Sequence, residues 1–369
     1  MFLLSYNQAR YVALRPPHAQ DNDIEDPESI SVEKRTNITK RPSTFVITIF
    51  CLFFFATGFL CGEFIQEKGL ISKLNQAQNS RCQAPSIRRE WRSLSSDEKT
   101  DYISAVRCLL SKPSKVPAGT SLYHDFPRLH SVVGGDSHNT ALFLPWHRYL
   151  LHVYENELRS TCGYNGSLTY WDWSLDWESL ADSPVFSNTT GFGGNGDSSA
   201  PESVGGGYCV TDGPFSDLEL DVFGLEDDRH CLSRGFTDGK VLGRLNGDKV
   251  KPAVIEEILR QPDYASFFVK LEDGPHNQIP NGIQGDFIKF TAPNDPLFFL
   301  HHSQLDRLWW MWQQRNLRPR LSDYGEIKKH EAVTQTSLSD AISIGGIMAP
   351  DIHVSDVMST ESDLLCYRY

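Results

Sequence analysis

Several stretches of the chain carry apolar residues at the spacing of one face of an α-helix. The clearest runs from residue 141 to 158, where Trp146, Leu150 and Tyr154 share a face. Alternation of the kind found in half-buried strands is scarce. We therefore expect a mainly helical, all-α domain. The same spacing predicts further helices over residues 252–260, 264–272 and 296–314.

Residues 87–109 also follow the helical period, but a capping sequence divides them. Ser95 and Ser96 stand directly before Asp97 and Glu98. Serine followed by acidic residues is typical of a helix start, because the serine oxygen and the carboxylates can accept from the free N–H groups of the first turn. We expect a short turn before this point and a longer helix after it.

The distribution of polar and apolar residues divides the chain into successive parts. Asp, Glu, Pro and Asn dominate the N-terminal segment, which is typical of disorder. We expect a disordered tail over residues 1–41, a transmembrane helix over 42–62, a polar stalk over 63–86, the main helical domain over 87–320 and an extension packed on that domain over 321–369.

Residues 42–62 carry no charge. At about 1.5 Å per residue, a helix of this length is roughly long enough to cross the hydrocarbon core of a bilayer. A cleaved signal peptide is the alternative, but such peptides normally begin close to the N-terminus, and a long polar segment precedes this run. The positive-inside rule predicts a single-pass protein with a cytosolic N-terminus and its main domain in the secretory lumen or outside the cell. The cations that set this orientation are Lys34, Arg35, Lys40 and Arg41.

In that orientation the cysteines after the membrane run would lie in an oxidising compartment, where thiols pair as disulfides. Cys51 and Cys61 lie in the membrane run, and an even set remains beyond it. Cys82 and Cys108 bracket a predicted helix, so we expect them to form one disulfide. The other cysteines of the set are Cys162, Cys209, Cys231 and Cys366.

Three acceptor sequons bear on the same topology. The triplets at Asn165 and Asn188 would be available for glycosylation in the lumen, whereas the one at Asn37 should stay unmodified in the cytosol. We therefore expect a glycoprotein, although an unused triplet is a common alternative.

Charge excludes one class of partner. The chain has 369 residues and a formal net charge of -12, and no stripe of Lys and Arg interrupts this acidity. Because phosphate binding needs clustered cations, we expect no nucleic-acid partner.

A first group of histidines indicates a metal site. His130, His138 and His147 are separated by eight and nine residues. Nine residues turn a continuous helix by about 900°, which would put His138 and His147 on opposite faces, so we expect a loop to carry His138. His147 is in line with Leu150 and Tyr154 and should point inward. One such histidine would be read as a core residue, but three favour a metal.

A second group lies more than a hundred residues further on. His302 and Asp306 are four residues apart and therefore share a helical face. We expect His302 to bind the metal and His301 to support it without binding. The Asp306 carboxylate could orient the ligand helix or a neighbouring imidazole.

Here the residues resemble a known family. The segments SLYHDF, SHNTALFLPWHRYLLHVYENEL, YWDW, GPHN and APNDPLFFLHHSQLDRLWWMWQ are similar to the type-3 copper signatures of tyrosinases and catechol oxidases, over about residues 88–314. The chain looks most similar to short tyrosinase-like proteins of filamentous fungi, which often serve secondary-metabolite pathways. The resemblance implies a four-helix bundle with two copper ions, each held by three imidazoles, and dioxygen bound between them. It assigns His130, His138 and His147 to one copper, and His276 and His302 to the other.

The resemblance also suggests residues that would act on a substrate. Phe298 stands one helical turn before His302 and would provide a shelf for an aromatic ring, unless it is a plain core residue. Asn277 matches the position where an Asn helps to activate a water for phenol deprotonation. Glu272 or Asp273 would assist, or would be solvated loop acids.

Two positions depart from the family pattern. The second copper site normally begins with His-Asn-x-x-His, but this chain has Pro280 at the second histidine. Proline cannot bind copper and disturbs a helix interior. Either the second copper has fewer ligands, or another imidazole replaces the missing one. Asp136 stands where many fungal tyrosinases have a cysteine bonded to a copper ligand. The candidate replacements at the second site are His301, His230 and His124.

Three functions remain open from the sequence. The leading one is a membrane-anchored copper oxidoreductase that uses dioxygen on a phenol or catechol, for example a tyrosyl group in a small natural product or peptide. The second is a copper- or dioxygen-binding protein without catalytic activity and with an incomplete second site. The third is a structural partner of other enzymes of a pathway. Copper content separates the third from the first two.

Overall fold

The computed structural model describes residues 82–369 except 118, 221–228, 326, 330–331 and 335. These residues belong to one compact unit, Ser72–Tyr369. The predicted tail, the transmembrane helix over 42–62 and most of the stalk lie outside the described residues. Within the described ranges, no helix has the length and apolarity needed to cross a membrane.

The mainly helical class is confirmed. The helices are α2 (Ser96–Ser111), α3 (Leu122–Val132), α4 (Phe143–Cys162), α5 (Pro252–Leu259), α6 (Tyr264–Leu271), α7 (Asn277–Ile283), α8 (Leu297–Gln314), α9 (Leu317–Arg320) and α10 (Val354–Val357). The predicted division near residue 95 is also confirmed, since a 3-10 turn over Trp91–Ser93 precedes α2 and Ser95 and Glu98 form its capping box.

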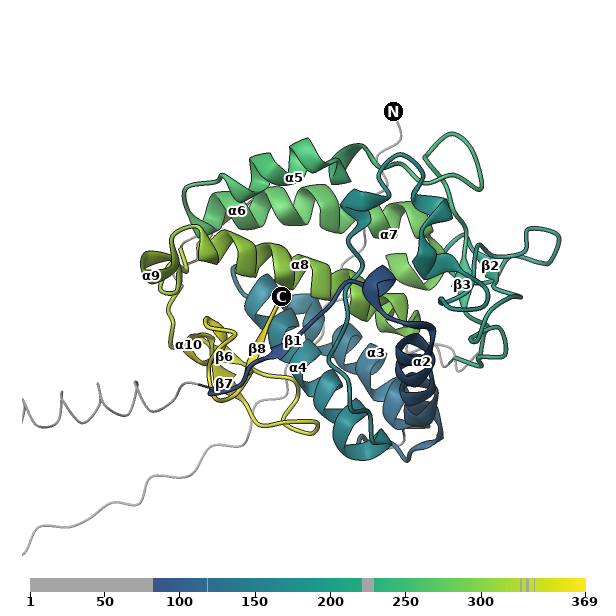
Figure 1. Ribbon diagram of the computed structural model, residues 1–369, viewed down its shortest axis with the longest axis horizontal. Coiled ribbons are helices and arrows are strands. Elements are labelled where there is room, and N and C mark those ends of the chain that lie inside the picture. The colour runs from purple at the N-terminus through teal and green to yellow at the C-terminus, as the bar shows by residue number, and fades with distance from the viewer. Residues whose placement is uncertain (1–81, 118, 221–228, 326, 330–331, 335) are drawn as a thin grey trace, which may run out of the picture. The chain divides into compact units, whose positions relative to one another are not determined.

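Helix α8 is packed between α4 and α6 by aromatic rings (Figure 1). On one side, Tyr154 of α4 stacks on Phe299 with centroids 3.5 Å apart and planes 2° apart. On the other, Phe267 of α6 stacks on Trp312 at 5.0 Å. Because all four side chains are buried, this packing fixes both faces of the helix that carries His301 and His302.

Strands are short and pair two by two. The parallel pair joins the two ends of the described chain, β1 (Ser86–Ile87) with β8 (Tyr367–Arg368). The antiparallel pairs are β2 (Tyr208–Cys209) with β3 (Ser233–Arg234), β4 (Ile327–Lys329) with β5 (Ala332–Thr334), and β6 (Ala341–Ile342) with β7 (Ile352–His353).

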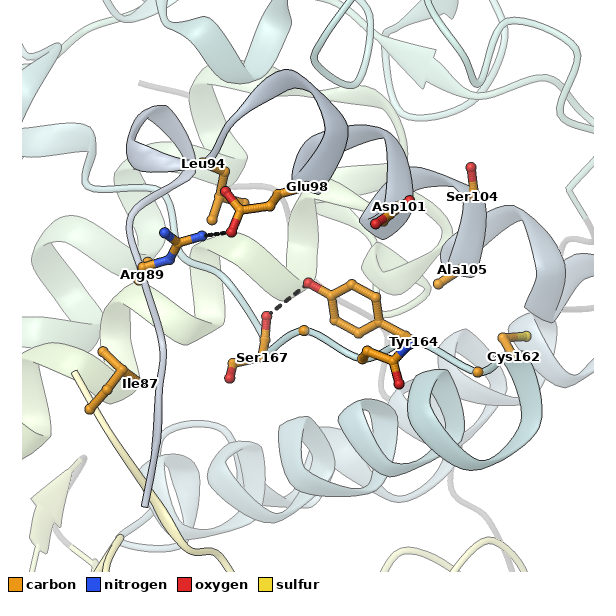
Figure 2. A pocket seen from close by; sticks show the side chains of 13 residues that line it. Ile87, Arg89, Leu94, Glu98, Asp101, Ser104, Ala105, Cys162, Tyr164 and Ser167 are labelled. Atoms are coloured by element: carbon orange, nitrogen blue, oxygen red, sulfur yellow. Dashed lines mark hydrogen bonds and ion pairs between the residues drawn. The ribbon is translucent and has the colours of Figure 1, made fainter. Parts of the chain in front are cut away.

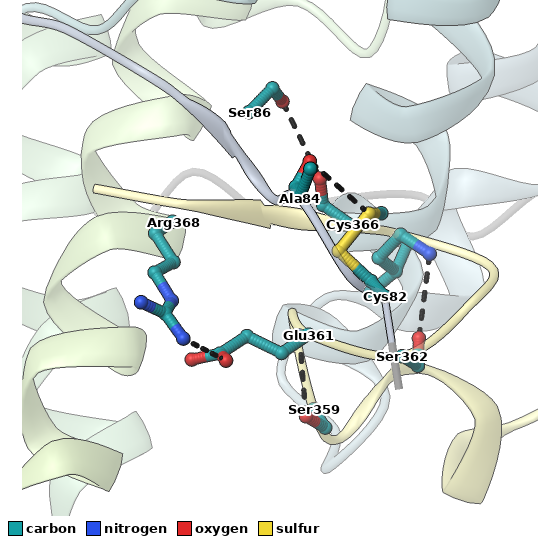
Figure 3. The surroundings of a disulfide bond; sticks show 9 residues. Cys82, Ala84, Ser86, Ser359, Glu361, Ser362, Cys366 and Arg368 are labelled. Atoms are coloured by element: carbon teal, nitrogen blue, oxygen red, sulfur yellow. Dashed lines mark hydrogen bonds and ion pairs between the residues drawn. A yellow bond between two sulfur atoms is a disulfide. The ribbon is translucent and has the colours of Figure 1, made fainter. Parts of the chain in front are cut away.

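The predicted Cys82–Cys108 disulfide is wrong. Cys82 lies just before β1 and bonds to Cys366 just before β8, so this bridge reinforces the parallel strand pair (Figure 3). Cys108 lies in the last turn of α2 and bonds to Cys162 at the end of α4, because these two helices pack together. The remaining bridge is Cys209–Cys231.

Side chains of α4 donate hydrogen bonds to backbone carbonyls of the segment beyond residue 320. The Trp146 indole donates to the carbonyl of Ser343 at 2.9 Å, and the Tyr149 hydroxyl donates to that of Pro350 at 2.6 Å. Two side chains that carry a polar group at the end of an apolar body therefore tie the C-terminal segment to the helix of His147.

A buried cluster of charges joins α4, α8 and both strands β1 and β8. The Asp306 carboxylate accepts hydrogen bonds from Arg148 and from the Tyr367 and Tyr369 hydroxyls. Arg88, which follows β1, donates to Asp306 at 3.3 Å and to Glu155 at 2.6 Å. The arginine and carboxylate side chains are all buried, so each charge depends on its partners for stabilisation.

Candidate metal centre

The first three predicted ligands come together. His130 lies near the end of α3, His138 follows a 3-10 turn over Gly134–Ser137, and His147 lies in the second turn of α4. Their ligand atoms all lie within 4.8 Å of one another. The expectation that a loop carries His138 is confirmed, because the chain leaves the helical conformation there.

Each ring of this triad is held by a backbone carbonyl. The Nδ1 atoms of His130, His138 and His147 lie 2.6, 2.9 and 2.7 Å from the oxygens of Phe290, Gly134 and Phe143. A carbonyl can only accept, so each Nδ1 carries the proton and each Nε2 keeps a lone pair. The Nε2 atoms of His130 and His147 face each other at 3.3 Å. Two lone pairs at this distance repel unless a cation lies beside them, so this triad fits a metal.

A second triad contains His276, His301 and His302, whose ligand atoms also lie within 4.8 Å of one another. His276 ends a single π-helical turn, Glu272–His276, directly before α7, while the other two are neighbours on α8. The His276 Nδ1 lies 3.0 Å from the Asn277 side-chain oxygen. The sequence predicts only a supporting role for His301. In the structure, a ring nitrogen of His301 lies close enough to those of His276 and His302 to bind the same metal ion.

Five of the six imidazoles are deeply buried, all except the half-buried His138, and burial determines the charge of these five. Burial, reinforced by the neighbouring His138, lowers the pKa of His130 to about 3. Burial alone lowers the pKa of His301 to about 3 as well. The pKa values of His147, His276 and His302 lie well below their usual range, again through burial first and neighbouring imidazoles second. These rings are therefore neutral at pH 7, the state in which imidazole binds metals.

A cavity of about 280 Å³ opens onto both triads. His130 and His138 of the first triad and His276 and His302 of the second line it. A separate hollow of about 500 Å³ lies between α2 and the segment after α4, shares no lining residue with the first and contains no histidine (Figure 2).

Other predicted residues also line the histidine cavity, among them Asn277, Phe298, Glu272 and Pro280. The Phe298 ring lies 4.1 Å from the His302 ring and 5.0 Å from the His130 ring, so it touches both triads. Glu272 is buried and accepts from the backbone N–H of Asn139 at 2.8 Å.

Some candidates lie elsewhere. His230 contacts the Asp286 carboxylate at 2.8 Å, and the His124 Nδ1 contacts the hydroxyls of Thr120 and Ser121. Neither belongs to a histidine triad among the described residues. The Asp306 carboxylate contacts arginine and tyrosine side chains, as described above, and so acts on the placement of α8.

Sequence reasoning missed three contributors to the site. Phe143 packs against rings of both triads, at 4.7 Å from both His147 and His276, and its position four residues before His147 could have revealed it. Trp173 donates its indole N–H to the Nδ1 of His301 at 3.2 Å. The Phe290 carbonyl that holds His130 has no sequence signal, since every residue has a carbonyl.

Comparisons of the sequence and of the structure with known proteins find tyrosinases and a polyphenol oxidase. The family described as the common central domain of tyrosinase matches residues 120–315. Tyrosinase ustQ of Aspergillus flavus is 46% identical over 288 residues, 78% of this chain and 80% of the relative. Tyrosinase-like protein phomQ1 of Diaporthe leptostromiformis is 47% identical over 307 residues, 78% of each chain. A solved polyphenol oxidase variant from Thermothelomyces thermophila superposes with a TM-score of 0.69 at 31% identity, covering 82% of this chain and 95% of the other.

Proposed function

The chain belongs to the tyrosinase family of di-copper oxidases, and we propose that it oxidises a phenol or a catechol with dioxygen in the cavity lined by both histidine triads. One observation carries the proposal: two groups of three imidazoles lie side by side, and two imidazoles of each group line one cavity. Copper held there would carry electrons from the phenolic ring to dioxygen.

Side chains of the cavity would position the substrate ring. Phe298 is buried between His130 and His302 and presents an aromatic surface in the cavity wall. A phenol ring packed against it would stand beside both triads. This gives Phe298 a placing role and leaves the chemistry to the metal site.

Glu272 and Asn277 would hold the water that takes the proton from the phenol hydroxyl. The Asn277 side-chain oxygen is engaged by His276, so its amide N–H groups remain to donate to a water. Glu272 lines the same cavity, and its carboxylate, which accepts from the Asn139 N–H, is a base within that cavity. A water held between these two side chains would accept the hydroxyl proton as the phenol approaches.

The size and rim of the cavity favour a phenol that belongs to a larger molecule. A volume of about 280 Å³ is small for a ligand site and suits one ring with a short linker. Ile288 and Phe290 line the cavity and are 39% and 55% exposed. Such apolar surface would contact the rest of the substrate, as in a tyrosyl residue of a peptide or another secondary metabolite. The relatives from Aspergillus and Diaporthe, named as a tyrosinase and a tyrosinase-like protein, support an oxidase that acts on a phenol.

We also propose that this domain works in the secretory lumen or outside the cell, tethered by the predicted helix over residues 42–62. Three disulfides support an oxidising compartment. Asn165 and Asn188 are exposed, as acceptors of glycans must be.

The test uses full-length protein loaded with copper(II). Dioxygen uptake and o-quinone absorbance are followed with a tyrosyl peptide, the matching catechol peptide, free tyrosine and a phenylalanine peptide as control. We expect quinone from the peptides with a phenol or catechol and none from phenylalanine. Copper-loaded protein that consumes no dioxygen with any of them would contradict the proposal and leave a copper-binding protein without catalysis.

A further inference from the structure

We propose that His301 replaces the residue at position 280 as the third ligand of the second copper, and that a hydrogen bond from Trp173 makes this the weaker of the two copper sites. The inference rests on the proposed function and concerns how this chain completes a site that lacks a family ligand.

Position 280 cannot supply a ligand. Pro280 lies inside α7, one turn after His276, and its side chain has no donor atom. The proline lines the histidine cavity instead. Without a replacement, the second copper would be held by His276 and His302 alone.

His301 has a ring atom suited to the vacant role. Its Nε2 is fully buried and has no hydrogen-bond partner. A buried ring nitrogen without a partner is costly unless a ligand completes it. The Trp173 indole engages Nδ1, so Nε2 is the atom left to join His276 and His302. Its ring lies 5.7 Å from that of His276 and 5.2 Å from that of His302.

The Trp173 contact distinguishes this imidazole from those of the first triad. An indole N–H can only donate, so the Nδ1 of His301 must accept. A neutral ring has one N–H, which then sits on Nε2. Copper binding at Nε2 requires that hydrogen on Nδ1 instead, where it would face the indole N–H. Loading copper at the second triad therefore breaks a buried hydrogen bond.

The first triad meets no such conflict. All three of its Nδ1 atoms face carbonyl oxygens, which stabilise the tautomer that binds metal. The two sites should consequently fill in order, the first triad before the second. They should also empty in the reverse order when a chelator is added.

The experiment counts copper in full-length protein by mass spectrometry and follows electron paramagnetic resonance during titration with copper(II) alone. Wild type should bind two coppers in two steps. His301→Gln should bind one and show the signal of an isolated Cu(II). His230→Gln, which changes the histidine bound to Asp286, should still bind two. Two coppers in His301→Gln, or a copper lost in His230→Gln alone, would overturn the ligand assignment.

Two further variants test the role of Trp173 and exclude misfolding as the cause of copper loss. Trp173→Phe keeps a ring of similar character and removes the donor, so the second copper should resist about tenfold more chelator; unchanged or weaker retention would overturn the role of Trp173. Moving the ligand back to α7 with Pro280→His in the His301→Gln protein should restore the second copper, which excludes misfolding as the cause of its loss. Failure of this rescue, with a single copper remaining, would count against an exchange of ligand positions.

These outcomes separate the inference from the proposed function. A wild-type protein that binds no copper would remove both. A wild-type protein that binds two coppers and forms quinone, while His301→Gln also binds two, would remove only the inference.

Discussion

His147 and His302 stack face to face across the interface of α4 and α8, with ring centroids 4.2 Å apart and planes 10° apart. Because one belongs to the first triad and the other to the second, this stack sets the separation of the two metal sites. The packing of α4 against α8 therefore determines the distance between the two copper sites.

Removing one member of this stack should abolish copper chemistry without unfolding the domain. We expect His147→Gln to lose the first copper and to lower quinone formation by more than about a hundredfold, since metal sites depend strongly even on residues that only support a ligand. Copper content and dioxygen uptake measure this. His152→Gln is the matched control on the same helix, because the His152 ring contacts Asn156 and Tyr149 and belongs to neither triad. Equal losses in both variants would mean that α4 itself had been disturbed.

The helical framework of the site could be predicted from the sequence. Periodic apolar residues located α4, α5, α6 and α8, and the spacing of His138 and His147 predicted that a loop carries His138. Each of these signals is local. The disulfide of Cys82 could not be predicted, because its partner is 284 residues away and is chosen by the pairing of β1 with β8.

The second triad shows the same limit. His301 and His302 are adjacent on α8, and neighbours on a helix point about 100° apart, so the sequence favoured only one as a ligand. Their rings meet beside His276 because its helical segment packs across them, and this is a tertiary fact. Pro280 signalled that a ligand was missing, but nothing local indicated which residue would take its place.

Asp306 should prove essential to stability. The carboxylate neutralises Arg148 and Arg88 in a buried setting, and removing one partner of such a group leaves uncompensated charge. We expect Asp306→Asn to lower the free energy of unfolding by about 3–5 kcal/mol, measured by denaturant unfolding. The exposed pair of Arg368 and Glu361 provides the control, for Glu361→Gln should change stability by less than about 1 kcal/mol.

The same cluster predicts a dependence of stability on pH. Burial by itself would raise the pKa of the Asp306 carboxyl, but Arg148, Arg88 and the tyrosine hydroxyls together hold the pKa below its usual value. A depressed carboxyl pKa contributes stability that is complete above the unfolded-state pKa of about 3.9 and disappears as pH falls through the folded-state value. Wild type and Asp306→Asn should therefore differ fully at pH 6 and converge in acid, below about pH 4. A constant difference across this range would show that the loss comes from packing and not from charge.

The bridge between Cys82 and Cys366 should stabilise the domain more than the bridge between Cys209 and Cys231. Both constrain the unfolded chain, but their sequence separations are 284 and 22 residues, and the entropy removed grows with the length of the closed loop. Replacing the first pair by serine should cost about 2–4 kcal/mol and release β8 from β1, which carries Tyr367 of the Asp306 cluster away with it. Thermal unfolding of the two double variants measures the difference. A larger loss for the shorter loop would contradict this ordering.

Glycosylation tests the predicted topology directly. Asn165 is exposed beside the hollow between α2 and the end of α4, and Asn188 is exposed in a separate loop, so both are open to modification once the domain enters the lumen. We expect glycosidase treatment of membrane-bound protein to lower its mass, by one step less in Asn165→Gln or Asn188→Gln and by no step in the double variant. Asn37→Gln is the control and should change nothing. Because a transferase meets only the lumenal side, a mass shift that depends on Asn37 alone would place the N-terminus in the lumen, and the copper domain would then face a compartment in which its disulfides are hard to maintain.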